Sequence, residues 1–422
     1  MTVELPALPA HWGNSRVDRV ASVNARIGWK ALTAAEYQPQ GFTFLSTPNI
    51  KGREIDFDNV NYITEFRYQE SPELKLREGD VLLAKDGNTL GIVNLVKYLP
   101  RPATVNGSIA VIRPTGIDGA FLRYVLASRV TQAAINMLKG GMGVPHLFQW
   151  DINRLPVPVP PLEEQRRIAD FLDVETARID RLTQLRSRQA GLLEERFGLA
   201  LDKAFENATY EPTRLKYLLA VKPRYGVLVP QYSDSGVRFI RVNDLLDLAG
   251  RADSLAKIPD ELSSQYARTV TRPGDVLLSV VGTMGRSAVV PPQLAGANVA
   301  RAVASLRTRH EVSPELLATW LTTPSFLRQA SDVTGSDTAQ PTLGMEDLSN
   351  FRLSWPVDER GRDELLLVTS TIRRHQRELT GVLEVQRRVL TERRQALITA
   401  AVTGQFDVST ASGRNVTDGV NA

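Results

Sequence analysis

LPVPVPPLEEQRRIADFLDVETARIDRL, residues 155–182, is the stretch that decides how this chain is organised. Its alternating prolines and valines end at Pro160 and Pro161, and proline interrupts both helices and strand ladders. Two glutamates, Glu163 and Glu164, follow where negative charge favours the first turn of a helix. Apolar residues then recur at steps of three and four, the spacing of an amphipathic helix. We therefore predict that a folded domain ends near residue 160 and that a long helix begins there.

The second half of the chain repeats the first. The segment Arg77–Leu83, REGDVLL, recurs 195 positions later as Arg272–Leu278, RPGDVLL. Further anchors lie at this offset or within a residue of it: Phe121–Leu126 with Leu316–Leu321, Gly87 with Gly282, and Pro145, Leu147, Asp151 and Pro160 with Pro341, Leu343, Asp347 and Pro356. The resemblance is weakest in the N-terminal portion of each half. This pattern indicates a duplication whose two copies have diverged at their surfaces.

The repeat predicts five segments in a chain of 422 residues, which is too long for one compact domain. We expect globular domains at residues 1–160 and 209–357, helical regions at 161–208 and 358–405, and a disordered tail at 406–422. Each domain combines short β-rich runs, such as Asp80–Ala84 and Asp275–Val281, with glycine-rich turns and one short helix. The predicted fold class is α+β, with two duplicated α/β domains separated by two long helices.

Each predicted long helix carries one apolar stripe. The stripes comprise Ile168, Phe171, Leu172, Ile179, Leu182, Leu185, Leu192 and Leu193 in the first helix, and Leu365, Val368, Ile372, Leu379, Val382, Val389, Leu397 and Ala400 in the second. Because two such stripes can cover each other, we expect an antiparallel coiled coil. The arginines on the other faces of the second helix fit a solvated surface or a contact with phosphate or an acidic partner.

Composition narrows the function further. The chain has no cysteine and only four histidines, none of them paired as on a zinc-binding helix. Residues 1–20 contain no apolar run of signal-peptide length, and no stretch approaches the ~20 apolar residues that span a bilayer. We expect a cytoplasmic, metal-free protein. A net charge of +4 is compatible with a polyanionic partner and is also common among soluble proteins.

Motifs for catalysis and nucleotide binding are missing from the sequence. Neither Gly87–Gly91 nor Gly140–Gly143 has the spacing of a phosphate-binding loop or of a dinucleotide fingerprint. There is also no nucleophile elbow and no His-Glu-x-x-His zinc motif. We expect no active site and no cofactor in this chain.

Three glycine-rich loops keep their position in the repeat while their side chains change. They are residues 85–91 against 281–286, 106–108 against 298–301, and 139–146 against 335–340. Amide, hydroxyl and basic side chains on such loops suit contacts with base edges and phosphates. Tight turns beside strands would explain each glycine taken alone; the recurrence of the set favours recognition.

A family resemblance fits these observations. Pro160–Asp173, PPLEEQRRIADFLD, together with Thr176 and Ile179-Asp180, closely resembles the central conserved helix of specificity subunits of type I restriction–modification systems. Leu390–Gly404 resembles the end of that family's distal helix. The second helix departs from the pattern, because Asp358–Glu364 replaces the Pro-Leu-Glu-Glu-Gln motif, so its docking surface need not match the first.

The resemblance implies two target-recognition domains, each reading one half of a bipartite, asymmetric site in double-stranded DNA. The helices would set the spacer and dock two modification subunits, while restriction subunits complete the complex. S-adenosylmethionine would bind to the modification subunits, which methylate adenine, and ATP with magnesium to the translocating restriction subunits. For docking we expect a set on the first helix: Glu164, Gln165, Ile168, Phe171 and Leu172.

The expected DNA-contacting residues are polar or basic residues in loops. They are Lys51, Lys85, Asn88, Asn106, Lys139 and His146 in the first domain, and Arg224, Tyr225, Arg241, Thr283, Arg286, Arg301 and Gln340 in the second. Tyr225 also fits a packed aromatic residue, and His146 a structural role. Two other interpretations are a DNA-modifying enzyme on one chain, which the missing motifs disfavour, and a coiled-coil scaffold that binds proteins rather than DNA.

Overall fold

The computed structural model describes residues 5–25, 32–140, 145–207, 210–335, 341–405 and 407–408. The chain forms two compact units. Unit 1 comprises Met1–Arg186 and Gln386–Ala422, and unit 2 comprises Ser187–Val385. Each unit therefore contains one globular domain and a part of each of the two long helices.

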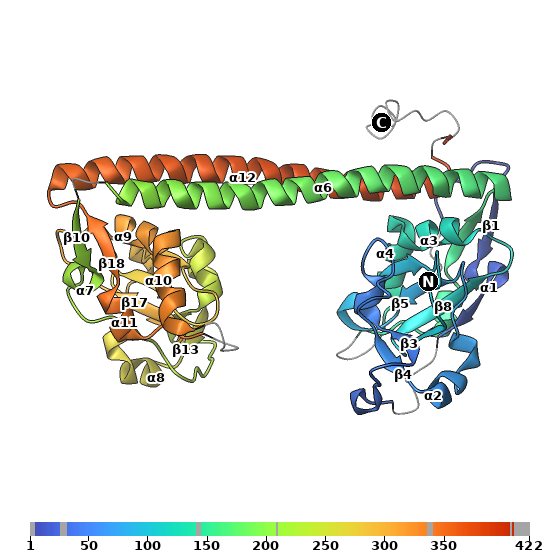
Figure 1. The fold of residues 1–422 in the computed structure, drawn as a ribbon, viewed down its shortest axis with the longest axis horizontal. Helices are drawn as coiled ribbons and strands as arrows, with labels where there is room; N and C mark the ends of the chain where they lie inside the picture. Colours follow the sequence, from blue (N-terminus) through green and yellow to red (C-terminus); the bar gives the residue numbers. More distant parts are fainter. Residues whose placement is uncertain are drawn as a thin grey trace. The chain divides into compact units, whose positions relative to one another are not determined.

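The long helices are α6 (Leu162–Phe205) and α12 (Glu359–Val402), each of 44 residues. They run antiparallel and lie side by side (Figure 1). In unit 1 the start of α6 meets the end of α12, where Arg394 Nε lies 2.9 Å from Asp180 Oδ1. These helices and the two α/β domains confirm the predicted α+β fold class.

The domain of unit 1 is built on two sheets. One has the order β2-β8-β5-β6 and the other β4-β3-β7, in which β3 pairs parallel with β7. The strands are β2 (Ala21–Asn24), β3 (Phe42–Leu45), β4 (Asn61–Ile63), β5 (Val81–Ala84), β6 (Val93–Leu95), β7 (Ala103–Val105) and β8 (Ile109–Pro114). Helices α3 (Gly119–Ala127) and α4 (Arg129–Leu138) follow them.

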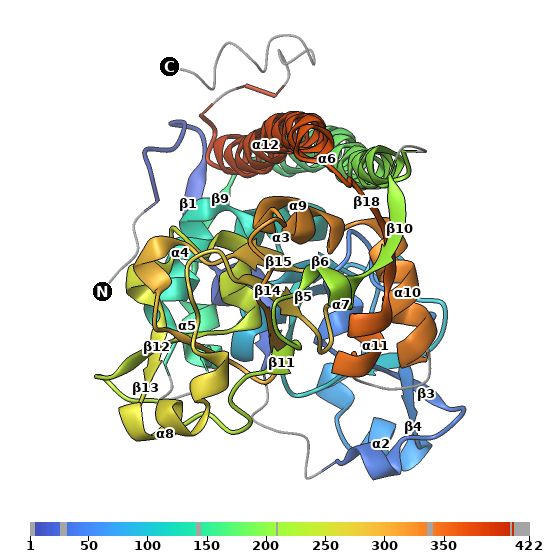
Figure 2. The ribbon, with the colours of Figure 1, turned by 90° about the vertical axis from the view of Figure 1, so that its left-hand side faces the viewer.

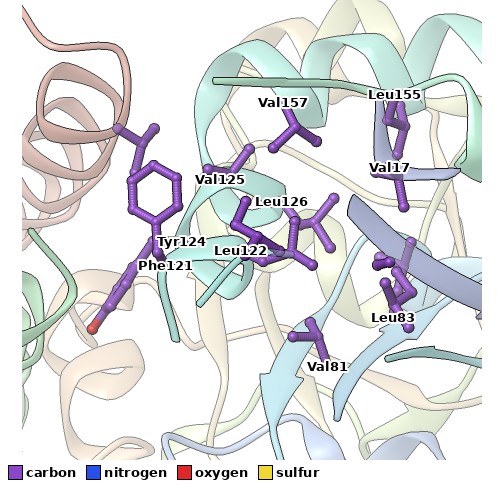
Figure 3. Close-up of a cluster of buried hydrophobic side chains, with 14 of the residues drawn as sticks. Val17, Val81, Leu83, Phe121, Leu122, Tyr124, Val125, Leu126, Leu155 and Val157 are labelled. Atoms are coloured by element: carbon purple, nitrogen blue, oxygen red, sulfur yellow. The ribbon is translucent and has the colours of Figure 1, made fainter. Parts of the chain in front are cut away.

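Strand β5 is buried on both faces, which explains its uninterrupted apolar sequence. Its side chains alternate between two cores, as the pleat of a strand requires. Val81 and Leu83 join the core that contains Leu122 of α3, whereas Leu82 joins the core that contains Phe44 of β3. Figure 3 shows the first of these cores.

Unit 2 repeats this architecture. Its sheets have the orders β11-β17-β14-β15 and β13-β12-β16. The strands are β11 (Arg224–Tyr225), β12 (Val237–Ile240), β13 (Ala256–Ile258), β14 (Val276–Ser279), β15 (Ser287–Val289), β16 (Asn298–Val299) and β17 (Val303–Leu306), and the helices after them are α9 (Pro314–Trp320) and α10 (Pro324–Thr334). Strand β14 again alternates between two cores, with Val276 in one and Leu277 in the other.

The repeated Gly-Asp motif makes the same contacts in both units. Arg113 donates from Nε and Nη2 to Asp80 over 2.8 and 2.7 Å, and Arg307 does the same to Asp275 over 2.8 and 2.7 Å. Both carboxylates are buried. The preceding Gly79 and Gly274 have φ of 89° and 83°, a backbone conformation that glycine adopts without steric cost.

A two-stranded ribbon joins each domain to the long helices. In unit 1 it consists of β1 (Gly13–Arg16) and β9 (Pro156–Val159), and in unit 2 of β10 (Glu211–Arg214) and β18 (Arg352–Trp355) (Figure 2). The proline run before α6 therefore forms a strand and does not merely end the domain. Because its prolines alternate with valines and β9 has one partner, the valines supply the N–H groups that pair with β1.

Candidate nucleic-acid interface

The predicted loops of unit 1 come together beside the end of β5. Leu147 N donates to Lys85 O over 2.9 Å, Lys85 N donates to Ser108 O over 2.8 Å, and Gly87 N donates to Pro145 O over 2.8 Å. We call the described residues 85–91, 106–108, 139–140 and 145–146 the first loop cluster. Backbone hydrogen bonds therefore connect the three loops of this cluster.

Five of the six predicted DNA-contacting residues of domain 1 lie in this cluster. Asn88 and Lys139 are exposed, and Asn106 is half-buried with its Oδ1 accepting from Ser108 N over 3.2 Å. The Lys85 side chain is only 1% exposed, with its Nζ 3.3 Å from Asp86 Oδ2. Lys85 therefore offers no surface to DNA in this structure, and its ammonium instead balances the charge of Asp86.

His146 is held in a defined orientation by Asp86. Its Nδ1 is paired with Asp86 Oδ1, and its ring meets Phe148 edge-on at a centroid distance of 4.5 Å. A carboxylate accepts hydrogen bonds, so this pairing places the proton of the imidazole on Nδ1. In the neutral ring, Nε2 is then an acceptor, and it has no partner among the described residues. An acceptor of this kind suits the exocyclic amino group of adenine or cytosine.

Two aromatic residues that were not among the predicted contacts extend this cluster. Phe148 stacks on Trp150 at a centroid distance of 4.1 Å and an interplanar angle of 8°. Trp150 is 54% exposed, which is unusual for a side chain of its size. The alternation of ring side chains at positions 146, 148 and 150 was the available signal.

Unit 2 builds an equivalent cluster with the same backbone hydrogen bonds. Leu343 N donates to Val280 O over 2.9 Å, Val280 N to Ala302 O over 2.9 Å, and Gly282 N to Pro341 O over 3.1 Å. We call residues 280–286, 298–302 and 341–343 the second loop cluster. Valine and threonine stand here where the first cluster has Lys85, Asp86 and His146, so the two clusters share a frame and differ in chemistry.

Three predicted residues lie close together in and beside the second loop cluster. Tyr225 is half-buried and donates from its hydroxyl to Leu343 O over 2.6 Å, so it has the packing role that the sequence also allowed. Burial raises the pKa of Tyr225, while the positive charge of Arg301 opposes the rise. Arg301 is exposed in the cluster, and Arg224 is half-buried on β11 beside Tyr225.

Two further arginines converge on the 3-10 helix η5 (Val242–Asp247). Arg286 Nη1 donates to Asn243 Oδ1 over 3.0 Å. Arg241 Nε donates to Asp244 Oδ2 over 3.3 Å, and this hydrogen bond is the main cause that raises the pKa of Arg241. Thr283 is exposed at the tip of its loop, and Gln340 lies outside the described residues.

Lys51 is the predicted residue of domain 1 that lies outside the first loop cluster. It is exposed and follows the 3-10 helix η2 (Thr47–Ile50). It lines a separate pocket together with arginines of α3, α6 and α12.

The predicted docking residues of α6 are mostly occupied within unit 1. Ile168 and Leu172 are buried in its core, and Phe171 packs against that core. Gln165 is buried and joins Asp118 N to Pro160 O through hydrogen bonds of 2.8 Å each, and Glu164 accepts from Trp12 Nε1 over 3.1 Å. A surface made of Gln165, Ile168 and Leu172 does not fit this burial, because these side chains attach the helix to its own domain.

The predicted apolar stripes cover each other only in part. In unit 1 the exposed apolar residues of the long helices are Leu162, Val174, Leu182, Leu185 and Val389, and in unit 2 they are Leu192, Leu199, Leu367, Val368, Leu379, Val382 and Val385. The spacing of seven that relates Leu185, Leu192 and Leu199 is typical of a helix that packs against another helix. Each unit therefore leaves part of the predicted apolar stripes exposed.

Within the described ranges, no three His, Asp or Glu side chains are grouped so as to hold a metal ion. Among the same residues, no helix is long and apolar enough to cross a membrane.

Comparison with known proteins relates the chain to one family. The model of the type I restriction modification DNA specificity domain matches residues 11–189. The EcoBI specificity subunit of Escherichia coli is 28% identical over 314 residues, which cover 66% of this chain and 64% of that protein. The MjaVIII specificity subunit of Methanocaldococcus jannaschii is 23% identical over 197 residues, 46% of this chain and 45% of that protein. The chain thus spans less than two thirds of the length of these two relatives.

A solved structure supports the fold over nearly the whole chain. It comes from work on complex assembly and conformational transition of the type I restriction–modification system, and it aligns with a TM-score of 0.65 at 19% identity. The alignment covers 95% of this chain and 100% of the other. Residues 11–189 of this chain therefore match the DNA specificity domain of type I restriction–modification systems, and the fold of the chain resembles that of the solved structure.

Proposed function

We propose that this chain is the DNA-reading subunit of a type I restriction–modification complex. Each loop cluster reads one half of a bipartite, asymmetric site in double-stranded DNA. The observation that carries the proposal is the shared backbone frame of the two clusters, which holds Asp86 and His146 in one and Val281 and Thr342 in the other. Two copies of one frame with different side chains suit the reading of two different half-sites.

Base discrimination would come from the exposed polar side chains of the clusters. We assign Asn88, Lys139 and His146 to the first half-site and Thr283, Arg286 and Arg301 to the second. A well-placed bidentate contact with a base edge discriminates by about 1–3 kcal/mol. Asn106, Arg224 and Arg241 have partners in the protein, and they can contact DNA in addition to supporting the loops.

The long helices would set the spacer and dock the partner subunits. An α-helix rises 1.5 Å per residue and keeps its length, so a change in helix length changes the separation of what it carries. The exposed apolar residues of α6 and α12 in each unit are suited to packing against helices of the modification subunits. Within this assembly, which we place in the cytoplasm, the chain itself performs no catalysis. The modification subunits would bind S-adenosylmethionine, and restriction subunits would bind ATP with magnesium.

The test is adenine methylation mapped by single-molecule sequencing. Cells carry this chain with its modification subunit, and the control cells lack only this chain. We expect a new bipartite motif with a degenerate gap, and exchange of residues 1–155 for those of a relative changes one half of it. If both halves change, the modular assignment is wrong. If the chain assembles with a partner but neither binds DNA nor directs methylation, it is a protein scaffold instead.

A further inference from the structure

A basic pocket of about 1020 Å³ lies in unit 1 between the globular domain and the long helices. Six cationic side chains line it: Lys51, Arg53, Arg123, Arg178, Arg181 and Arg394. They come from the loop after η2, from α3, from α6 and from α12. We call this site the basic pocket, and it is separate from the residues that form the first loop cluster.

The positive charge of the basic pocket is mostly uncompensated. Asp180 is the one carboxylate among the described lining residues, and it is paired with Arg394 over 2.9 Å. Arg123 is 3.4 Å from Asp173 and lies over the ring of Tyr124. The other four cations, Lys51, Arg53, Arg178 and Arg181, are exposed and form no ion pair or hydrogen bond with any described residue. Four unpaired cations around one hollow attract an anion.

The four free cations sit on fixed elements of the structure. Buried Asn94 donates from Nδ2 to Ile50 O over 3.1 Å and to Gly52 O over 3.0 Å, which holds the loop that carries Lys51 and Arg53. Arg178 and Arg181 are three residues apart on α6, so they lie on neighbouring parts of one helix face. Ile179 between them is buried in the core of unit 1. The loop and the helix thus hold the cations without a ligand.

The basic pocket adjoins the first loop cluster along the chain. Val93 lines the pocket and opens strand β6, and Gly91 closes the loop that carries Asn88. Two residues of extended chain span at most about 7 Å. The DNA major groove is about 12 Å wide between its flanking backbones. A duplex whose bases meet the first loop cluster therefore brings phosphates within reach of the basic pocket.

The chemistry of the lining favours phosphate over an acidic peptide. Guanidinium groups match phosphate oxygens with paired donors. The lining has six cationic side chains against four aliphatic ones, Val93, Ala127, Ala177 and Ile398, so cationic groups outnumber the side chains that would pack against a peptide. Resting on the proposed function, we propose that the basic pocket binds phosphates of the DNA backbone beside the half-site read by domain 1.

In the described residues of unit 2, the domain side of this pocket has lost its two cations. The hydrogen bond of Ser46 N to Asn49 Oδ1 matches that of Arg241 N to Asp244 Oδ2, which fixes the alignment of the two halves here. In this alignment Leu246 and Leu248 stand in place of Lys51 and Arg53. The proposed phosphate contact therefore belongs to unit 1, so the DNA backbone would be held more tightly beside the half-site read by domain 1 than beside the other.

The experiment measures binding of labelled duplexes to the complex of this chain with its modification subunit between 50 and 200 mM salt. One duplex contains the sequence motif that the complex methylates, and the other duplex does not. The variant changes Lys51, Arg53, Arg178 and Arg181 to alanine. A matched control changes Arg374 and Arg377 to alanine, since these exposed arginines have the same spacing on α12 and lie in unit 2.

Each lost phosphate contact lowers the slope of log K against log salt by about 0.9, or about 3.5-fold in affinity across this salt range. We expect the alanine variant to lose affinity for both duplexes equally and to lower the slope of log K against log salt by up to about 3.6. The sequence motif that the complex methylates should stay the same. The control keeps the wild-type slope. A variant with only Arg178→Lys and Arg181→Lys also keeps most of it, because both positive charges remain.

A wild-type slope in the alanine variant overturns the proposal. So does a variant that no longer assembles with the modification subunit, because the pocket then binds an acidic segment of that partner. An altered motif would make the pocket a base reader and equally contradict phosphate binding. A wild-type complex that binds both duplexes equally well would refute the proposed function. This outcome differs from an unchanged salt slope in the alanine variant, which refutes only the phosphate contact in the pocket.

Discussion

Replacing a buried leucine of α6 by alanine should lower the stability of the chain much more than replacing an exposed leucine of the same helix. Leu172 is 0% exposed in the core of unit 1, whereas Leu185 is 53% exposed. Leu172→Ala leaves a cavity, and buried leucine-to-alanine changes cost about 2–5 kcal/mol of unfolding free energy. Leu185→Ala removes no core contact, so its cost to the isolated chain should stay within about 0.5 kcal/mol.

For binding of the modification subunit, the exposed Leu185 should matter more than the buried Leu172. Full burial of a leucine contributes about 1.5–3 kcal/mol, so covering the exposed half of Leu185 contributes about 1 kcal/mol. Leu185→Ala should therefore weaken binding of the modification subunit about fivefold. Leu365→Ala and Leu379→Ala provide the same comparison in unit 2, because Leu365 is buried and Leu379 is exposed.

Hydrogen exchange resolved by peptide measures the first effect, because it reports the stability of each unit separately. Calorimetric titration with the modification subunit measures the second. The reasoning is refuted if Leu172→Ala leaves exchange in unit 1 unchanged and weakens assembly. It is also refuted if Leu185→Ala destabilises unit 1 as strongly as Leu172→Ala does.

Three further outcomes can be measured. Asp80→Asn should destabilise unit 1 by about 2–3 kcal/mol, because it removes charged hydrogen bonds from Arg113, and Asp275→Asn should do the same to unit 2. If either variant changes hydrogen exchange equally in both units, this expectation is wrong. Burial raises the pKa of Tyr124 from 10.0 to about 12, so the folded state keeps a proton that the unfolded state loses, and stability should fall as pH rises through this interval. Tyr124→Phe should make alkaline urea denaturation less steep with pH than in the wild type, and an unchanged pH profile would exclude this cause. His146→Ala should relax one half of the methylated motif and leave the other intact, as sequencing of modified DNA would show; relaxation of both halves would contradict its assignment to domain 1.

The sequence predicted the architecture well because the information that sets it is local or repeated. The Gly-Asp motif keeps the turn, the buried carboxylate and the following strand in both halves, and the stripe from Ile168 to Ile179 predicts a helix by spacing alone. The repeat also identified the glycine-rich loops that keep their position while their side chains change, whereas the contacts between these loops come from the structure.

The sequence could not predict which of these side chains are free. Lys85 looked like a loop cation, but it is the residue directly after β5 and its side chain turns into the interior, where Asp86 balances it. Leu172 and Leu185 belong to one stripe by spacing, yet only the three-dimensional packing decides which of them the domain covers. Trp150 was missed because an aromatic residue in a short helix is more often a core residue.

The bonding of the loop clusters explains how one chain can hold two different recognition sites. The contacts that close each cluster run from backbone N–H to backbone C=O, as from Leu147 to Lys85 and from Leu343 to Val280. A change of side chain leaves these hydrogen bonds in place, so it alters the presented chemistry at little cost in stability. The Arg113–Asp80 contact has the opposite character, because loss of either side chain leaves a buried charge or donor unpaired. Divergence should therefore be tolerated at positions such as 88 and 146, and it should be resisted at 80 and 113. Two recognition sites can then differ in their exposed side chains while their backbone hydrogen bonds stay the same.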